Sequence, residues 1–386
     1  MDWLNGMAFY RLSEEYPYLS SKASGLADHL ALDNRTPPDL LNNAIYIHMM
    51  EVTAIMAEAV GRTDCAALLR QRHDQAKADW NRAYVDPATG KTRGLRGRTI
   101  HTQASYATPL NFNVFDDTNK EKAGHWLSVL AAAPATSGPT PEEEEAQKLI
   151  VEDVTSAFGV LGSGNTDFNF KPYTISTGFS GTPNILPALS RAGYSEEAFR
   201  MFSCTDYASW LYPVTCGATS IWERWNSYDA AFSEPNQNSM NSFNHFALGA
   251  VGQWMFEYQL GIASAYTEGE AGYKHFILQP SAGGDFTSLE GSYDSHYGRI
   301  RSAWTAEKGV IMSYRCSVPA NTTATLYLPV TSGAVSGLGS VSGARCMGVC
   351  THLGHPAVRY ELVSGDWSFT LDDGRISVNP LSDAVR

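Results

Sequence analysis

One acidic side chain lies between two indoles in the segment Trp222-Glu223-Arg224-Trp225. The Gly-Ala-Thr string at 217–219 favours a loop here. A carboxylate among aromatic rings suits sugar chemistry, because the rings offer apolar faces to sugar C–H groups and the carboxylate binds hydroxyls or activates a water. The same residues also fit a partly buried tryptophan cluster with a Glu–Arg pair at the surface. Composition alone does not separate these two interpretations.

A second polar string follows 18 positions after Glu223, just before a predicted helix. It contains Asn241, Ser242, Asn244 and His245. Serine and asparagine at such a place also serve as helix caps. A histidine at a helix entrance is commonly a structural hydrogen-bonding group. Its closeness in the chain to Glu223 favours a shared site instead.

The composition indicates a folded protein that does not bind polyanions. The chain has 386 residues, 43% hydrophobic and 18% charged, with a net charge of −12. Such a chain can bury a large core and does not have the composition of a disordered protein. A negative charge of this size argues against nucleic acid or an anionic membrane as partners. Neutral ligands are easier to reconcile with it.

The sequence contains no membrane-spanning or cofactor-binding signature. No run approaches the roughly 18 apolar residues of a membrane span, and the first residues lack the basic and apolar regions of a signal peptide. The six cysteines form no Cys-x-x-Cys pair, so we expect them to be reduced and the protein to be cytoplasmic. No nucleotide-binding string and no EF-hand-type loop is present. We expect no cofactor and no metal ion.

Helical periodicity dominates residues 36–262. The first predicted helix is capped by Thr36, begins with two prolines and is closed by Gly61. A second helix starting at Asp64 completes a helical hairpin. Further helices are predicted near 119–132, 183–193, 196–205 and 241–260, and a polar surface loop is predicted for 134–145. Repeated hairpins without a fixed sequence period favour an α/α toroid over a solenoid.

The pattern changes after about residue 266. Short alternating segments at 274–279, 299–305, 309–315, 323–329 and 357–363 predict strands. They indicate a β-sandwich of about 120 residues. The predicted boundary lies at Thr267-Glu268-Gly269-Glu270, which gives a helical domain over 1–266 and a β-sandwich domain over 267–386.

Three ordered motifs carry a family resemblance, at 177–183, 217–225 and 240–245. They read TGFSGTP, GATSIWERW and MNSFNH. Together they resemble the signature of bacterial and fungal α-L-rhamnosidases, the inverting glycoside hydrolase family 78. The strings at 272–275 and 292–298 resemble the start of that family's C-terminal β-sandwich. The resemblance implies an (α/α)6-barrel catalytic domain, followed by a β-sandwich, that acts on a rhamnose-containing glycoside.

The resemblance also implies roles for individual residues. Glu223 matches the general base that activates the attacking water, and His245 matches a histidine that contacts the sugar. Four further residues are expected at the sugar: Trp222, Trp225, Asn244 and Asp28.

Two features depart from the family pattern. Asp28 resembles the aspartate of a Gly-Asp-Trp-Leu element, but His29 stands where tryptophan is usual. The family's general acid belongs to an Asp- and Glu-rich motif upstream of that element, and the residues before Asp28 do not match it. We therefore expect the chain to lack the first barrel helices, to expose an apolar flank and to associate with itself.

Three functions remain open at this point. The first is an α-L-rhamnosidase, slowed by the absent acid motif. The second is a non-catalytic rhamnose-binding homologue that keeps the pocket wall. The third is an inactive fragment.

Overall fold

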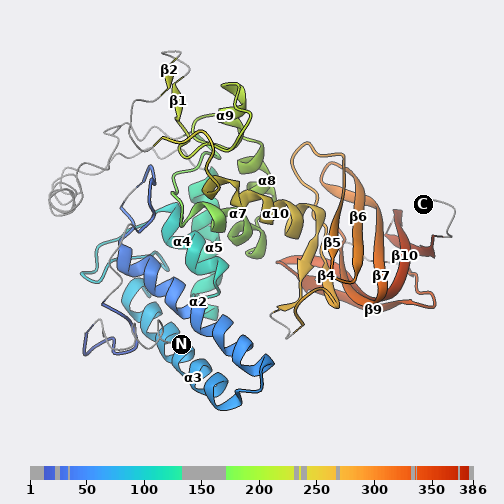
Figure 1. Ribbon diagram of the computed structural model, residues 1–386, viewed down its shortest axis with the longest axis horizontal. Helices are drawn as coiled ribbons and strands as arrows, with labels where there is room; N and C mark the ends of the chain where they lie inside the picture. Colours follow the sequence, from blue (N-terminus) through green and yellow to red (C-terminus); the bar gives the residue numbers. More distant parts are fainter. Residues whose placement is uncertain are drawn as a thin grey trace. The chain divides into compact units, whose positions relative to one another are not determined.

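A helical unit and a sheet unit make up the computed structural model (Figure 1). The first contains residues 1–192 and 200–250, and the second contains 193–199 and 251–386. The structure describes residues 13–21, 27–33, 35–132, 171–229, 234–235, 241–266, 270–331, 335, 337–372 and 374–381. The predicted loop at 134–145, Met240 and most of the predicted domain boundary lie outside these residues. That boundary therefore stays a proposal.

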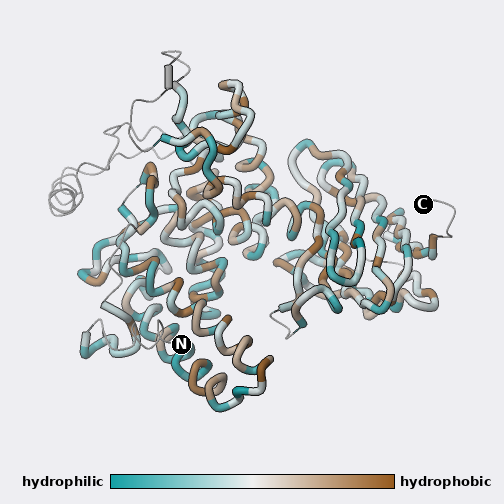
Figure 2. The backbone as a smooth tube through the Cα atoms, viewed as in Figure 1, coloured by the Kyte–Doolittle hydropathy of each residue, from teal (hydrophilic) through white to brown (hydrophobic). Residues whose placement is uncertain are grey.

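The long hairpin of α2 and α3 opens the helical unit. Hydrophobic and hydrophilic positions alternate along both helices (Figure 2), and the indole N–H of the buried Trp80 donates to the Leu40 carbonyl at 3.0 Å. Gly61 adopts a φ of 75° between the helices, which only glycine adopts readily. The predicted hairpin is confirmed, but its predicted cap is wrong. The N-cap of α2 is Pro37, because the Thr36 hydroxyl is hydrogen-bonded to the Thr102 hydroxyl at 2.6 Å.

The helices of this unit are shorter after the first pair. They are α2 (Pro38–Ala59), α3 (Thr63–Tyr84), α4 (Gln103–Asn111), α5 (Asp117–Ala132), α7 (Thr182–Arg191), α9 (Leu211–Thr215) and η1 (Ala247–Ala250). The helix α8 (Ser195–Ser203) is divided between the two units. The helical unit also contains a strand pair, β1 (Tyr228–Asp229) and β2 (Glu234–Pro235). The buried α4 anchors the segment that leads to α7. Its Gln103 amide donates to the Thr174 carbonyl at 2.9 Å and accepts from the Ser176 N–H at 2.8 Å.

The single helix predicted over 241–260 is wrong. Residues 241–246 are not helical, and η1 is followed by α10 (Val251–Trp254) and the π-helix η2 (Met255–Leu260). The physical reason lies in the backbone of the first part. Ser242 and His245 use their N–H or carbonyl groups to bond with the loop at 221–223, so these groups are not available to a helix.

One mixed sheet forms the second unit. Its strands are β3 (Ile262–Ser264), β4 (His275–Leu278), β5 (Ser288–Ser295), β6 (Gly298–Glu307), β7 (Val310–Pro329), β8 (Gly337–Leu338), β9 (Ala344–His352), β10 (His355–Asp372) and β11 (Arg375–Pro380). The strands predicted at 309–315 and 323–329 are two halves of β7. The β7–β10 register jumps between Val363 and Gly365, and at this bulge both long strands pass from one half of the sheet to the other.

Both halves of the sheet bury their side chains in one core. Trp304 and Tyr314 come from one half, and Phe276 and Leu326 come from the other. This is the packing of the predicted β-sandwich. Within the described residues, no helix is long and apolar enough to cross a membrane, and no cluster of acidic, histidine or cysteine side chains suits a metal ion. The six cysteines are free thiols.

Candidate active site

Backbone hydrogen bonds bring the two polar motifs together. The Glu223 N–H donates to the Ser242 carbonyl at 2.9 Å, and the Ser242 N–H donates to Glu223 Oε2 at 2.8 Å. The His245 N–H donates to the Ile221 carbonyl at 2.9 Å. The Glu223 carboxylate and the His245 imidazole are therefore held on two paired segments. Glu223 is 9% exposed, so its carboxylate is largely withdrawn from water.

The two tryptophans flanking Glu223 are buried. Trp222 meets the ring of Phe243 edge-on at 5.5 Å, and Trp225 meets Trp210 edge-on at 5.8 Å. The Trp210 indole N–H donates to the Leu248 carbonyl at 2.9 Å. These contacts hold the loop in place, which is a supporting role. Direct contact of either indole with a sugar stays a prediction.

A row of rings runs from His29 to Phe246. His29 meets Phe179 edge-on at 5.4 Å, and Phe179 stacks on His245 at 4.9 Å. Phe246 also stacks on His245, at 5.1 Å. The His245 Nδ1 accepts the Ala247 N–H at 3.2 Å, so the proton of the neutral imidazole is on Nε2. That N–H is a hydrogen-bond donor held at a defined place.

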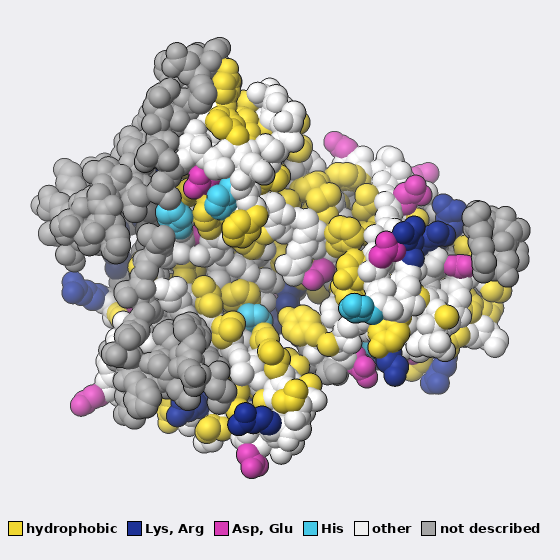
Figure 3. All heavy atoms as spheres, in the orientation of Figure 1, with side chains coloured by type: hydrophobic (Ala, Val, Ile, Leu, Met, Phe, Trp, Pro, Cys, Tyr) yellow, Lys and Arg dark blue, Asp and Glu magenta, His cyan; other side chains and the backbone are white. Residues whose placement is uncertain are grey.

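His29, Glu223, Arg224 and His245 share one electrostatic environment. Burial lowers the pKa of His29, the Arg224 charge lowers it further, and the Glu223 charge opposes both. Burial also lowers the pKa of Arg224, which the Glu223 charge raises. Figure 3 shows two histidine side chains beside an acidic one on the surface of the helical unit. Asn244 is exposed nearby, and its N–H donates to the Ser242 hydroxyl at 3.1 Å.

Asp28 is buried and binds backbone. Its Oδ2 accepts the Gly178 N–H at 2.8 Å, and its Oδ1 accepts those of Ser180 at 2.9 Å and Gly181 at 2.7 Å. Burial raises the pKa of Asp28 to about 6 despite these hydrogen bonds. The carboxylate therefore positions the loop that carries Phe179 into α7. The sugar contact of Asp28 stays a prediction.

Gly178 is required for the close approach of that loop. A Cβ at this position would lie 2.1 Å from the His29 carbonyl oxygen and 2.5 Å from the Ala31 nitrogen. We expect Gly178→Ala to destabilise the fold by about 2–3 kcal/mol, because two backbone segments must separate. Thermal unfolding measures this. Gly252→Ala is the matched control, since no heavy atom lies within 4 Å of its Cβ position; an equal loss in both variants would contradict the expectation.

Sequence reasoning missed three parts of the site. Phe179 lies inside the motif at 177–183, yet nothing in that motif indicates that its ring contacts both His29 and His245. Arg224 belongs to a surface pair in the alternative interpretation of the sequence, and the structure buries it beside Glu223. The Ser242 N–H is a backbone group without a side-chain signal, although its spacing from Glu223 in the family motifs could have suggested the pairing.

The arrangement can perform base chemistry on a bound water. One oxygen of Glu223 accepts the Ser242 N–H, and the other remains available to a water in the largely desolvated loop. The His245 Nε2–H can bind a sugar hydroxyl, and the exposed ring of Phe246 offers an apolar surface. Asp28 is unsuited to protonate a leaving group, because both its oxygens are engaged by backbone N–H groups.

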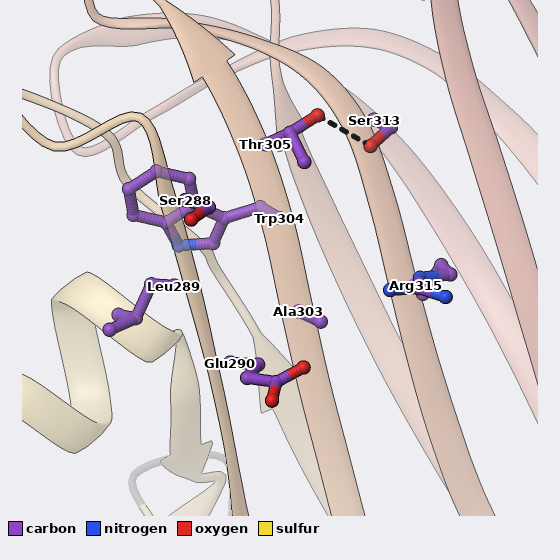
Figure 4. Close-up of a pocket in the computed structure, with 8 residues that line it drawn as sticks. All are labelled: Ser288, Leu289, Glu290, Ala303, Trp304, Thr305, Ser313 and Arg315. Atoms are coloured by element: carbon purple, nitrogen blue, oxygen red, sulfur yellow. Dashed lines mark hydrogen bonds between the residues drawn. The ribbon is translucent and has the colours of Figure 1, made fainter.

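A cavity on the sheet unit has a different character (Figure 4). It measures about 120 Å³, below the range of roughly 300–1,000 Å³ of small-molecule sites. The Thr305 and Ser313 hydroxyls bond to each other at 2.7 Å across it. It is lined by Ser288, Leu289, Glu290, Ala303, Trp304, Thr305, Ser313 and Arg315. Its size disfavours it as the main ligand site.

The profile of the bacterial alpha-L-rhamnosidase six-hairpin glycosidase domain matches residues 5–135 and 160–259, more than half of the chain. This chain belongs to that family. The bacterial alpha-L-rhamnosidase C-terminal domain matches residues 261–342. The two matches confirm the predicted fold class, a six-hairpin helical domain followed by a β-sandwich domain.

Similar rhamnosidases come from several organisms. An alpha-L-rhamnosidase of Streptomyces avermitilis is 31% identical over 80% of this chain and 25% of its own length, and one of Formosa agariphila is 29% identical over 76% and 26%. The crystal structure of the Streptomyces avermitilis alpha-L-rhamnosidase complexed with L-rhamnose has a TM-score of 0.71 at 28% identity, over 96% of this chain and 30% of that one. The native Aspergillus terreus enzyme shares the fold, with a TM-score of 0.64 at 22% identity over 91% and 34%. This chain thus spans about a quarter of the curated relatives.

Proposed function

We propose that this chain contributes the general base of an α-L-rhamnosidase active site, which hydrolyses terminal α-L-rhamnosides with inversion. The observation that carries the proposal is the Glu223 carboxylate, held by the Ser242 N–H at 2.8 Å on the segment paired with His245. The names of the relatives support the substrate class. The chain spans a quarter of those relatives, so the activity of the whole protein is part of the proposal.

Glu223 is the base in a single displacement. Its carboxylate accepts a proton from water while the water oxygen attacks the anomeric carbon, and the bond to the leaving oxygen breaks. The leaving oxygen takes a proton from a second carboxyl group, which in inverting enzymes lies about 6.5–9.5 Å from the first. We expect that acid in a motif upstream of Asp28, as the family resemblance implies. Substrates with good leaving groups need it least.

Rings and donors near Glu223 suit a deoxyhexose. The Nε2–H of His245 donates to a ring hydroxyl, and His29 offers a second imidazole on the other side of Phe179. The exposed face of Phe246 matches the methyl group that replaces a hydroxymethyl in rhamnose.

Two measurements test the proposed function. Hydrolysis of an aryl α-L-rhamnoside reports turnover, and titration calorimetry with L-rhamnose reports binding. Turnover supports the enzyme. Binding without turnover supports the second candidate, a non-catalytic rhamnose-binding homologue. If neither binding nor turnover is observed, both candidates are refuted.

His245→Ala is expected to weaken sugar binding. Loss of one hydrogen bond from Nε2 should raise the dissociation constant for rhamnose about five- to tenfold, because a small side chain leaves the hydroxyl without its donor. Calorimetry measures the change, and circular dichroism checks the fold. His125→Ala serves as the control, since His125 is exposed on α5. Equal affinities of the His245 variant and the unchanged protein would remove His245 from the site.

Assembly and location are further parts of the proposal. Self-association is supported by exposed apolar side chains on the α2–α3 hairpin, among them Met56, Val60 and Leu68. A cytoplasmic location is supported by the six free thiols.

A further inference from the structure

A second concave site lies wholly within the sheet unit. It measures about 330 Å³, at the lower end of the range of small-molecule sites. Its walls are the tip of the β5–β6 hairpin and the loop before β4. The lining residues are Gly272, Tyr273, Tyr293, Asp294, Ser295 and His296. None of them belongs to the Glu223 site.

We propose that this cavity binds a sugar unit of a rhamnose-containing polysaccharide and serves as an accessory carbohydrate site. The choice of rhamnose rests on the proposed function; the choice of a carbohydrate rests on the cavity itself.

Aromatic rings form one wall. Tyr273 and Tyr293 lie 4.6 Å apart at 36°, and Phe256 meets Tyr293 edge-on at 6.5 Å. Tyr293 is 38% exposed, whereas Tyr273 is half-buried and packs on the core residue Phe276. Tyr273 is thus packed against the core, and its ring contacts the exposed ring of Tyr293. An exposed aromatic face of this kind suits the C–H face of a pyranose ring.

Polar groups also line the cavity. Asp294 accepts the Arg299 Nε–H at 2.6 Å and an Nη2–H at 3.0 Å. Each carboxylate oxygen keeps a lone pair for a sugar hydroxyl, and the exposed imidazole of His296 supplies a donor and an acceptor. The carboxylate disfavours an anionic ligand. Together with the rings, these groups fit a neutral polyol.

The hairpin tip is held in shape before any ligand binds. The Ser295 hydroxyl donates to the Gly298 carbonyl at 2.7 Å and accepts the Tyr297 N–H at 3.2 Å. The Asp294–Arg299 pair bridges the same two strands. A preorganised tip loses little conformational entropy on binding. The few contacts of a single sugar unit therefore do not have to offset a large ordering cost.

Affinity electrophoresis with a neutral α-L-rhamnan tests the proposal. We expect the unchanged protein to be retarded in rhamnan gels and not in dextran gels. Tyr293→Ala should weaken the retardation about five- to tenfold, and Tyr293→Phe should retain it because the ring remains. Tyr297→Ala is the matched control, since Tyr297 is 43% exposed on the same hairpin and does not line the cavity.

The outcomes separate the two sites. Glu223→Gln should leave the retardation unchanged. The accessory site would be overturned if Tyr293→Ala were retarded as strongly as the unchanged protein. It would also be overturned if Tyr297→Ala weakened the retardation as much as Tyr293→Ala does, or if His245→Ala alone abolished the retardation. Absence of retardation in the unchanged protein would overturn it too. Hydrolysis of the aryl rhamnoside is measured separately, so failure of the accessory site leaves the proposed function standing. Circular dichroism of each variant excludes unfolding.

Discussion

Glu223→Gln is expected to lower kcat for an aryl α-L-rhamnoside by about 10²–10⁴. The amide cannot accept a proton from the attacking water, so the water must react without a base. The substitution preserves the site, because the Gln carbonyl oxygen can still accept the Ser242 N–H that now bonds Oε2 at 2.8 Å. We therefore expect the affinity for rhamnose to change little. Initial rates and calorimetry on both proteins measure the two quantities.

Azide distinguishes loss of the base from general damage. It is a nucleophile that needs no deprotonation, so it should attack the anomeric carbon of the substrate in the Gln variant and restore aglycone release. The glycosyl azide should have the inverted configuration, which NMR detects. Glu58→Gln is the matched control, because Glu58 is 57% exposed and pairs with Arg70 on the α2–α3 hairpin. Equal kcat values for the Glu223 variant and the unchanged protein would remove Glu223 from the mechanism.

Local sequence patterns predicted the elements whose causes are local. The α2–α3 hairpin follows from apolar spacing and from Gly61, and both are visible in the sequence. The Gly-Ala-Thr string at 217–219 also predicted the loop that carries Glu223. The role proposed for this carboxylate rests on a local signal too, a carboxylate among indoles. Its partner His245 was expected in the same site from chain proximity. The paired backbone of the two segments supports that expectation.

Features with distant causes were not predictable. The first residues of the helix expected over 241–260 are not helical, because they form hydrogen bonds with 221–223. No residue pattern within the segment indicates this pairing. Likewise, β7 looks like two strands because the bulge opposite Val363 and Gly365 interrupts its alternation. Asp28 is the sharpest case. Its partners, Gly178 and its neighbours, lie about 150 positions away, so its place at the base of a loop could not be inferred from spacing.

Asp28→Ala is expected to lower the free energy of unfolding by about 3–5 kcal/mol. Three backbone N–H groups, those of Gly178, Ser180 and Gly181, would lose their acceptor in a buried place, and each unsatisfied donor costs about 1–3 kcal/mol. Urea unfolding measures the loss. Asp206→Ala is the control, because its carboxylate pairs with Lys171 at the surface and should contribute less than about 1 kcal/mol. Similar losses in the two variants would contradict the stabilising role of the three hydrogen bonds to Asp28.

The pH dependence of stability tests the ionisation of the Asp28 carboxyl group. Burial raises the pKa of Asp28 from 3.8 to about 6, so the folded state holds this proton more tightly than the unfolded state does. The resulting stabilisation is complete below about pH 3.8 and is lost as the pH rises through about 6. Asp28→Asn does not titrate. The stability of the unchanged protein relative to this variant should therefore fall by about 2–3 kcal/mol between pH 4 and pH 8. Urea unfolding of both proteins at each pH measures the difference, in which other titrating groups cancel. Parallel profiles would mean that the three N–H groups outweigh burial and keep the carboxylate ionised throughout.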